Sequence, residues 1–556
     1  MFHIFVCFVI FVYFVILLPL QTMNLRTQEI KWSHILFALA VITGAWFRFY
    51  QLELKPLHHD EGVNSHFLLN LANFGNYRYD PENYHGPTLY YFALISLRLF
   101  GESEFALRFI PAIFGMLTII LIWPLRTHLG SVGVVVAAFC MAISPGLVYF
   151  SRDFIHEMAF GCFSMGVVTG AWRFAETKKS HWLLLLSVSA GFLFATKETA
   201  IITAVVLLIA IICAALWDNL NQLYSELNLT AYTLLDKLRQ DLRAISPTLD
   251  QALAATFIFL FINFIFYTSF FTHMGGAYDA VKSVWLWGQR SGSEHVKSFW
   301  YYLGILLKLE LPMLIGSLIG ALFVIRRGRL FSLFTAAWLL GMFLAYSIIG
   351  YKTPWLVISF LIPLTLMTGY AVQQLFQSFT SYPARITLFV VLILMLSYTS
   401  KISWTVNMVK YDDNSNHTAF FRKLGEMLDL MPYRDGLSGY VYAQTDRDIL
   451  NFVKEVKDET LKMPLQNNTG IYFASPDYWP LPWYLRDYIN SVYTGKLEVT
   501  PGRNPAISQP VVVANANQQM QLNEFPDWRM IARPYTLRPG VELVIYLHDQ
   551  VSEIPK

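Results

Sequence analysis

The sequence predicts an all-α polytopic membrane protein of about 11 to 12 transmembrane helices, followed by a small C-terminal α/β domain outside the membrane. Of its 556 residues, 55% are hydrophobic and only 14% are charged, against roughly 25% charged residues in an average soluble domain. The apolar residues fall in runs of about 18 to 22, the length that carries a helix across a hydrocarbon core of about 30 Å. These runs are therefore interpreted as membrane spans.

Residues 1–22 form an almost wholly apolar segment. They lack a basic n-region, and Gln21 and Thr22 stand where a small-residue cleavage site would be expected, so a removed signal peptide is disfavoured. The segment is either an extra span or an artefact of start-site choice, since Met23 begins a more ordinary amino terminus. Residues 23–402 then form the transmembrane domain, and residues 403–556 form the mixed α/β domain.

Apolar runs after Met23 predict about eleven spans. They lie near residues 33–50, 105–123, 131–150, 157–175, 182–196, 199–217, 252–271, 299–325, 330–350, 354–376 and 385–402. Between the spans, the short loops on one side are richer in lysine and arginine: Arg126, Arg173, Lys178, Lys179, Arg326, Arg327, Arg329 and Arg385 on that side, Arg152, Lys197 and Lys352 on the other. The richer side is expected to face the cytoplasm.

The chain is therefore predicted to be a multi-pass protein of the plasma (inner) membrane. This orientation places the first outer loop, residues 51–104, and everything after residue 402 on the outer side of that membrane. Residues 86–101 are apolar but shorter than a span, which predicts a helix at the membrane surface. The inner loop 218–251 has a charge pattern typical of a solvated helical connector.

Short alternating segments predict strands in the C-terminal domain, at residues 439–443, 470–473, 510–514 and 542–547. The string W-P-L-P-W-Y-L-R-D at residues 479–487 combines two prolines with three large aromatic residues. It is either a rigid aromatic surface near lipid or sugar, or part of the packed core of this domain.

Ionisable side chains are concentrated in the first outer loop, directly after the first span. His58, His59, Asp60 and Glu61 are consecutive, and His85 follows later in the loop. Charged residues so close to hydrocarbon are costly unless they face a cavity, so a functional role is the first interpretation. The alternative is an acidic loop that is only solvated.

Other predicted outer loops repeat this pattern of acids and cations at the outer ends of spans. The residues concerned are Arg152, Asp153, His156, Glu157, Lys197, Glu198 and Lys352. Carboxylates can orient or deprotonate an acceptor hydroxyl or amide, whereas Lys and Arg can neutralise a leaving phosphate. The pattern therefore suits transfer from a phosphate-linked donor.

At these residues the chain resembles a known family. The strings H-H-D-E, Y-R-Y-D-P, Y-H-G-P, Y-F-S-R, A-T-K-E-T-A and K-T-P-W-L follow one another in the order seen in the GT-C superfamily of membrane glycosyltransferases. That superfamily includes protein O-mannosyltransferases and the aminoarabinose transferases of lipid A. The motifs are most similar to a prokaryotic subfamily often labelled flippase activity-associated protein.

The resemblance implies roles for individual residues. It makes Asp60 the acceptor-side base and Glu61 its neighbour, and it makes Glu157 a second acidic candidate, where relatives often show Asp. It implies that Arg108 binds the donor phosphate. Further substrate contacts are expected from His59, His85, Arg152, His156, Lys197 and Lys352. Lys197 and Lys352 could instead form structural ion pairs.

The implied activity is inverting transfer of a hexose or pentose from a polyprenyl-phosphate sugar to a protein, lipid or glycan acceptor, as in protein glycosylation or cell-envelope assembly. No cofactor is expected: a divalent metal could bind the loop histidines and acids, but no closed metal-ligand spacing emerges. Nucleic acid is not expected as a partner, because no basic stretch interleaved with aromatics is present.

Two alternatives remain open. One is a non-catalytic transporter or flippase-associated protein that only binds lipid-linked sugars. It should show broken helices and polar groups at the bilayer midplane, where the sequence offers few candidates, such as Glu310, Lys308 and Asn263. The other is a chain that keeps the fold but has lost catalysis, against which the intact Asp60 and Glu61 pair argues.

Overall fold

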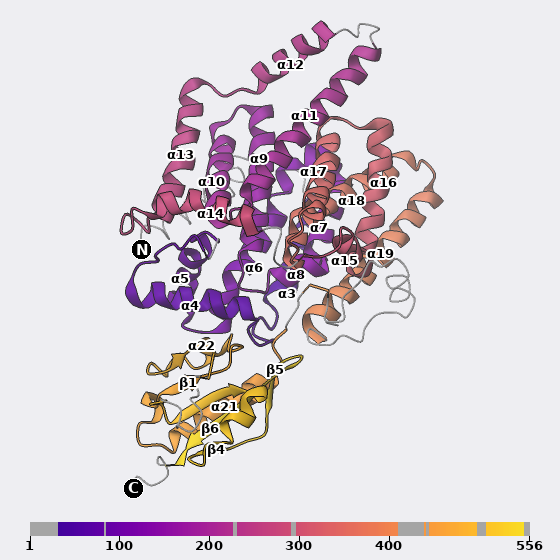
Figure 1. Ribbon diagram of the computed structural model, residues 1–556. Coiled ribbons are helices and arrows are strands. Elements are labelled where there is room, and N and C mark those ends of the chain that lie inside the picture. The colour runs from indigo at the N-terminus through magenta and orange to yellow at the C-terminus, as the bar shows by residue number, and fades with distance from the viewer. Residues whose placement is uncertain are drawn as a thin grey trace. The chain divides into compact units, whose positions relative to one another are not determined.

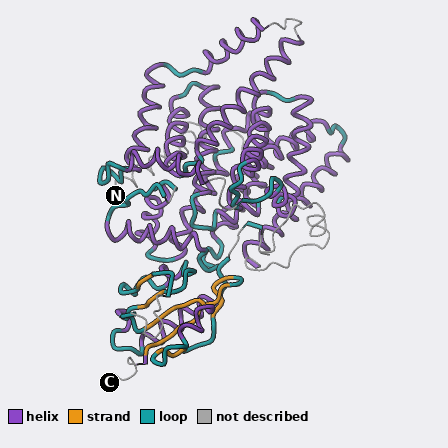
Figure 2. Tube along the Cα trace, viewed as in Figure 1, coloured by secondary structure: helices purple, strands orange, loops and turns teal. Residues whose placement is uncertain are grey.

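The computed structural model describes residues 32–82, 85–225, 231–290, 296–409, 439–440, 444–497 and 507–549. They fall into two compact units (Figures 1 and 2). The helical unit holds the described residues of Met1–Leu52 and Leu71–Lys410, and the C-terminal unit holds Glu53–Asn70 and the described residues of Tyr433–Lys556. The apolar segment 1–22 lies outside the described residues. The consecutive residues His58, His59, Asp60 and Glu61 of the first outer loop therefore belong to the C-terminal unit.

Helices make up almost all of the helical unit, drawn from indigo to orange in Figure 1. Its elements are α3 (Trp32–Phe49), the end of α4 (His59–Phe74), α5 (Thr88–Phe100), α6 (Glu104–Ile120), η2 (Trp123–Leu125), α7 (Arg126–Ile143), α8 (Pro145–Phe150), α9 (Glu157–Thr177), α10 (Ser180–Thr196), α11 (Ala200–Ser225), α12 (Ala231–Ile245), α13 (Leu249–Tyr267), α14 (Gly276–Arg290), α15 (Tyr301–Leu309), α16 (Leu311–Arg327), η3 (Pro354–Val357), α17 (Leu330–Ile348), α18 (Ile358–Ser378), α19 (Tyr382–Trp404) and η4 (Thr405–Val409).

Seven segments among the described residues are helical, long and apolar enough to cross a membrane, or eight if one bent pair counts as a span. This finding confirms a multi-pass membrane protein, but not the predicted count of 11 to 12. One reason is that α6, η2 and α7 form a single 40-residue apolar run, Glu104–Ile143. Another is that α5 and α10 are apolar but shorter. Helix α5 confirms the short helix predicted at residues 86–101, whereas its place at a membrane surface stays a prediction.

The prediction of one continuous span at residues 299–325 is wrong. Helices α15 and α16 meet at a bend of 108°, and Glu310 lies between them with Pro312 in the first turn of α16. Proline lacks an amide proton and its ring clashes with the preceding turn, so it ends a helix that arrives from its amino-terminal side. The carboxylate of Glu310 accepts hydrogen bonds from Ser144 Oγ (2.7 Å) and Gly146 N (2.9 Å), which stabilises the start of α8.

The C-terminal unit contains a six-stranded mixed sheet, which confirms the predicted small α/β domain. Its strands are β1 (Ile471–Phe473), β2 (Val492–Tyr493), β3 (Val511–Asn515), β4 (Trp528–Met530), β5 (Tyr535–Arg538) and β6 (Val541–His548). The order is β2-β1-β3-β6-β4, and β5 pairs with β6. Strand β1 is parallel to β2 and β3, whereas β6 is antiparallel to its neighbours. Three of the four predicted strands are present, and the fourth, 439–443, lies partly outside the described residues.

Both faces of this sheet are covered, because side chains alternate between faces along a strand. Ile471 and Phe473 face a core that includes Phe452 of α21 (Asp448–Leu461), whereas Tyr472 and Val512 face a second core around Trp528. Helix α21 presents its buried residues at helical spacing to the first core. The smaller elements η5 (Gln466–Asn468), α22 (Leu481–Tyr484), η6 (Ala516–Gln518) and α23 (Gln519–Leu522) connect the strands.

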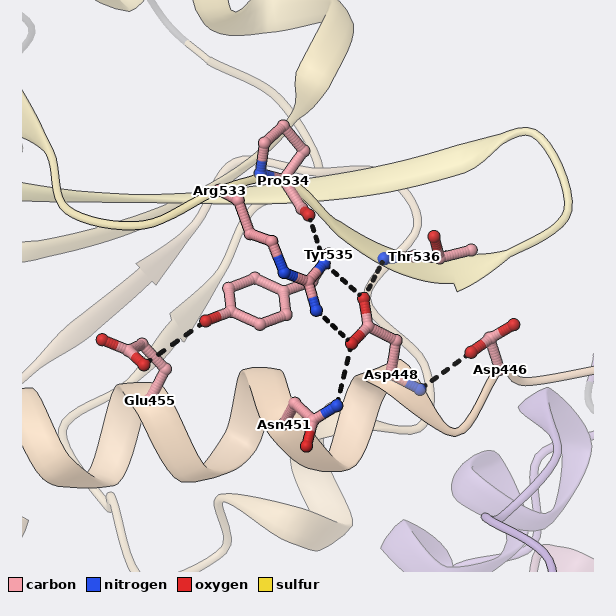
Figure 3. Close-up of polar contacts among 8 residues, drawn as sticks. All are labelled: Asp446, Asp448, Asn451, Glu455, Arg533, Pro534, Tyr535 and Thr536. Carbon is pink, nitrogen blue, oxygen red and sulfur yellow. Dashed lines mark hydrogen bonds and ion pairs between the residues drawn. The ribbon is translucent and has the colours of Figure 1, made fainter.

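A carboxylate at the start of α21 ties this helix to β5 (Figure 3). Asp448 accepts hydrogen bonds from Arg533 at both oxygens (2.6 and 2.8 Å), from Asn451 (2.9 Å) and from the amide of Thr536 (3.1 Å). Hydrogen bonds from Arg533, above all, hold the pKa of Asp448 at about 2. Paired guanidinium and carboxylate groups in this two-point geometry are the stronger kind of surface ion pair.

We expect Asp448→Asn to weaken the junction of α21 and β5 by about 1 kcal/mol near neutral pH, after allowance for solvent screening. Because the pKa of Asp448 is lowered on folding, its contribution is present above about pH 4 and is lost as the pH falls toward about 2. The readout is hydrogen exchange of the Thr536 segment, corrected for intrinsic rates. Asp458→Asn on the exposed side of α21 is the control; an equal effect of both changes would contradict the assignment.

Candidate functional site

The predicted acidic pair stands at the first turn of α4, and its two members have different surroundings. The Asp60 side chain is 32% exposed, whereas Glu61 is fully buried. Glu61 Oε2 accepts a hydrogen bond from the amide of His58 at 2.9 Å. The amide precedes the helix and would otherwise lack a helical partner, so Glu61 closes the amino-terminal end of α4. Asp60 is left facing outward.

Two histidines, His58 and His59, directly precede this pair. The amide of Asp60 donates to His58 Nδ1 at 3.3 Å, which places the ring proton of neutral His58 on Nε2. Burial lowers the pKa of His59 to about 4; the charge of Asp60 opposes this shift, and His58 lowers the pKa further. His59 is therefore neutral near pH 7, and it cannot supply the positive charge that a phosphate contact needs.

The aromatic string at residues 479–487 packs against this turn within the C-terminal unit. The rings of His59 and His66 meet the edge of Trp479 at centroid distances of 6.4 and 5.8 Å. A Cβ on Gly62 would lie 2.7 Å from Pro480 Cα, a contact that only glycine avoids. Tyr484 Oη also accepts a hydrogen bond from the amide of Leu57 at 2.9 Å. The string thus forms packed core and holds the segment that carries Asp60.

A second polar group lies in the helical unit, around a buried ion pair. Lys197 Nζ and Glu157 Oε1 are 2.6 Å apart, and both side chains are about 95% buried. Burial alone would lower the pKa of Lys197, but the attraction of Glu157 and Glu198 outweighs it and raises that pKa. A buried charge without such a partner is costly in any low-dielectric environment. Lys197 and Glu157 therefore neutralise each other here.

The His85-Gly86 turn completes this group. His85 Nδ1 lies 3.4 Å from Glu198 Oε2, and the amide of Gly86 donates to Thr196 O at 3.0 Å. His156 Nε2 lies 3.2 Å from Gly86 O, so the buried His156 donates through Nε2. Burial, together with the nearby His85 and Lys197, holds the pKa of His156 well below its usual range. The structure thus brings four predicted residues together: His85, His156, Glu157 and Lys197.

Arginines form a third group at the carboxyl end of α3. Arg152 donates to the carbonyls of Phe47, Arg48 and Tyr50 through Nη1 and to that of Gln51 through Nη2. Helix ends leave such carbonyls without helical partners, so Arg152 caps α3. Burial and the charge of Arg108 lower the pKa of Arg152 to about 10, which leaves it charged.

The other predicted cations are also buried. Arg108 donates to Leu52 O (3.1 Å) and lies 3.5 Å from Glu104. Lys352 donates to the carbonyl of Ile349 at the end of α17. Whether Arg108, Arg152, Lys197 or Lys352 shares a cavity with Asp60 involves both units and stays a prediction. Among the residues that the structure describes, no group of three His, Cys, Asp or Glu is arranged to hold a metal ion.

Three structural residues were not predicted as part of the site. Arg48 is fully buried and donates to Ser151 Oγ (3.1 Å), Ala142 O (3.0 Å) and Met141 O (3.1 Å). An arginine inside a predicted span was a usable signal, because such residues are rarely placed there without a role. Glu198 stands in the predicted pattern of acids and cations but was assigned no role of its own, whereas nothing around Trp479 in the sequence indicated its contact with the first loop.

Comparisons with known proteins agree with this architecture. A family profile described as dolichyl-phosphate-mannose-protein mannosyltransferase matches residues 84–235. The structure of ArnT from Cupriavidus metallidurans bound to undecaprenyl phosphate is similar at 15% identity, over 92% of this chain and 98% of that chain, with a TM-score of 0.57. No curated protein sequence matches the chain.

A further similar structure is the archaeal oligosaccharyltransferase AglB from Archaeoglobus fulgidus, in complex with an inhibitory peptide and a dolichol-phosphate. It is 13% identical over 88% of this chain and 70% of that chain, with a TM-score of 0.51. The family profile matches residues 84–235 alone, and the two similar structures, at 15% and 13% identity, show a shared fold; membership of the GT-C superfamily of membrane glycosyltransferases stays a prediction. Its place in the flippase-associated subfamily stays a prediction.

We expect Lys197→Met and Glu157→Gln each to destabilise the protein by about 3 kcal/mol, because each leaves the partner charge buried and unbalanced. The double variant should recover part of this loss. Thermal unfolding of the purified protein in detergent measures all three. Lys462→Met, which removes the exposed ion pair with Glu459, should leave the melting temperature unchanged. Single variants that melt like the wild type would show that the pair is not structural.

Proposed function

We propose that the chain is an inverting glycosyltransferase that moves a sugar from a polyprenyl-phosphate donor to an acceptor at the outer face of the plasma membrane. The observation that carries this proposal is the difference between the two acids at the start of α4: Glu61 is buried and closes the helix, while Asp60 is partly exposed. The GT-C fold supports it, since similar structures include ArnT bound to undecaprenyl phosphate and AglB with a dolichol-phosphate.

In the proposed reaction, an acceptor hydroxyl or amide attacks the anomeric carbon of the sugar. The bond from that carbon to the phosphate oxygen breaks, its electron pair goes to the phosphate, and Asp60 takes the proton of the acceptor. The polyprenyl phosphate leaves with an additional negative charge, which needs nearby cations rather than protonation. The protein therefore supplies position and electrostatics.

Among the predicted cations, we assign Arg108 and Lys352 to the donor phosphate. Arg152 donates to four carbonyls at and just beyond the end of α3, and Lys197 is neutralised by Glu157. These two residues are better interpreted as positioning residues that hold the helices behind the site. His59, His85 and His156 are proposed to contact the sugar or the acceptor, and Glu157 acts through Lys197.

One observation favours the transporter alternative, namely the break between α15 and α16 at buried Glu310. Transporters use broken helices to build substrate sites inside the membrane. In this chain, however, Glu310 accepts hydrogen bonds from Ser144 and Gly146 and so stabilises the start of α8. That contact gives the break a structural reason, and the enzyme remains the better supported function.

We expect Asp60→Asn to reduce sugar transfer by about a hundredfold or more, because it keeps the shape of the side chain but removes its charge and basicity. The assay follows product formation by purified protein supplied with a panel of polyprenyl-phosphate sugars. Glu53→Gln, which removes an exposed carboxylate from the same segment, is the matched control. Glu61→Gln should lower stability more than turnover.

The control is that the folded Asp60→Asn variant binds the donor as the wild type does. Transfer at the wild-type rate by that variant would refute the assignment of the base. If the wild type binds donors, moves them across a vesicle membrane and yields no product, the transporter alternative is correct.

We expect single cysteines at Asn73 and Met520, both exposed positions, to react with a membrane-impermeant thiol reagent in intact cells. The charge asymmetry of the short loops places both outside. A cysteine at Lys178 should react only after lysis and serves as the control. The opposite labelling pattern would reverse the proposed orientation and remove the outer active site.

A further inference from the structure

The helical unit contains a cavity of about 1030 Å³ at the end of the bundle away from His156 and Lys197. It lies between the last turns of α9 and α18, the first turns of α7 and α17, and one face of α11. Helix α9 has 21 residues, and a helix rises 1.5 Å per residue, so its two ends are about 30 Å apart. The cavity is lined by α9 from Val167, at the middle of the helix, to Glu176 near its end, whereas Glu157 of the polar group around Lys197 stands at its start.

Its deeper wall is apolar and opens sideways toward lipid. Helix α11 contributes Ala204, Leu207 and Leu208, and α9 contributes Val167 and Ala171. Leu208 is 59% exposed although it lines the cavity. On a membrane helix, that exposure means that the cavity communicates with the hydrocarbon beside α11.

Its mouth is polar and positively charged. Arg327 at the end of α16 and Arg329 just before α17 both line it. The acid that lines the cavity, Glu176, already contacts Arg173 and His128. Among the described residues, the structure records no ion pair for Arg327 or Arg329, and Asp218 influences Arg329 only at longer range.

We propose that this cavity binds an anionic lipid, with its phosphate at Arg327 and Arg329 and one acyl chain along α11. The volume is at the upper limit of the roughly 300 to 1,000 Å³ of ordinary small-molecule sites, and far exceeds the needs of a free phosphate. An apolar wall that opens to hydrocarbon and a basic mouth match the two parts of such a lipid. Basic pockets between transmembrane helices are suited to phosphate head groups.

The orientation proposed above places this mouth in the cytoplasmic leaflet, on the opposite side from the sugar-transfer site. The proposed site is therefore separate from the donor site. Neither Arg327 nor Arg329 belongs to the proposed catalytic group. A negative result for lipid binding would therefore leave the glycosyltransferase proposal unaffected, and the reverse also holds.

The test uses purified full-length protein in detergent and phosphatidylglycerol that carries a photoreactive diazirine in one acyl chain. Crosslinks should map to α9 residues 167–175 and saturate at low lipid concentration. The Arg327→Gln/Arg329→Gln variant should bind at least about tenfold more weakly, given the contribution of each basic residue to anionic lipid binding. Arg326→Gln, the matched neighbour that does not line the cavity, should bind like the wild type.

A second matched pair tests the apolar part. Leu208→Trp should reduce crosslinking, whereas Ile209→Trp should not, because Ile209 is exposed to a similar extent (54%) but lies outside the cavity. Equal crosslinking by phosphatidylcholine, equal loss with Arg326→Gln, or complete competition by inorganic phosphate alone would each overturn the proposal. Unchanged melting temperatures of the variants exclude loss of fold as the cause.

Discussion

Buried charge is the constraint on which the helical unit depends, because hydrocarbon offers no partner to a charged or polar group. Three buried charged residues near the ends of helices each have a partner within the helical unit. Arg152 uses carbonyls that the end of α3 leaves unpaired, Lys197 is matched by Glu157, and Glu310 accepts from the start of α8. Each contact joins segments distant in sequence. Charged residues whose positions in the sequence suggest catalysis therefore also determine how the helices pack. A charge near a membrane surface does not by itself identify a substrate contact.

The sequence predicted the membrane class and the small C-terminal sheet, because these depend on composition and local periodicity. It named His85, His156, Glu157 and Lys197 as site residues but did not predict that these four lie together. It failed at the span near residues 299–325, where hydropathy is continuous but Pro312 permits a sharp bend. Hydropathy indicates whether a segment favours hydrocarbon over water, but it does not indicate whether the helix axis changes direction within the segment. It also could not separate Arg152 from Arg108, since the carbonyl acceptors of Arg152 come from a helix end about a hundred positions earlier in the chain.

The C-terminal unit includes the segment that carries the proposed base, Asp60, although the sequence predicted it as a separate outer domain. The segment with Asp60 is packed within it: Leu57 is hydrogen-bonded to Tyr484, and Gly62 leaves space for Pro480. A side chain at Gly62 would push against backbone, which cannot yield as a flexible side chain can. The position of the proposed base therefore depends on residues more than 400 positions later, which local sequence patterns cannot reveal.

This dependence also explains why two adjacent carboxylates need not share a role. Glu61 is fully buried, and its contact with the His58 amide fixes the first turn of α4. Asp60, one position earlier, lies outside that contact, beside His58 and the neutral His59. A base must be able to reach its acceptor, and the Asp60 side chain is 32% exposed. In the proposed reaction, Glu61 holds the first turn of α4 in place, and the partly exposed Asp60 takes the proton of the acceptor.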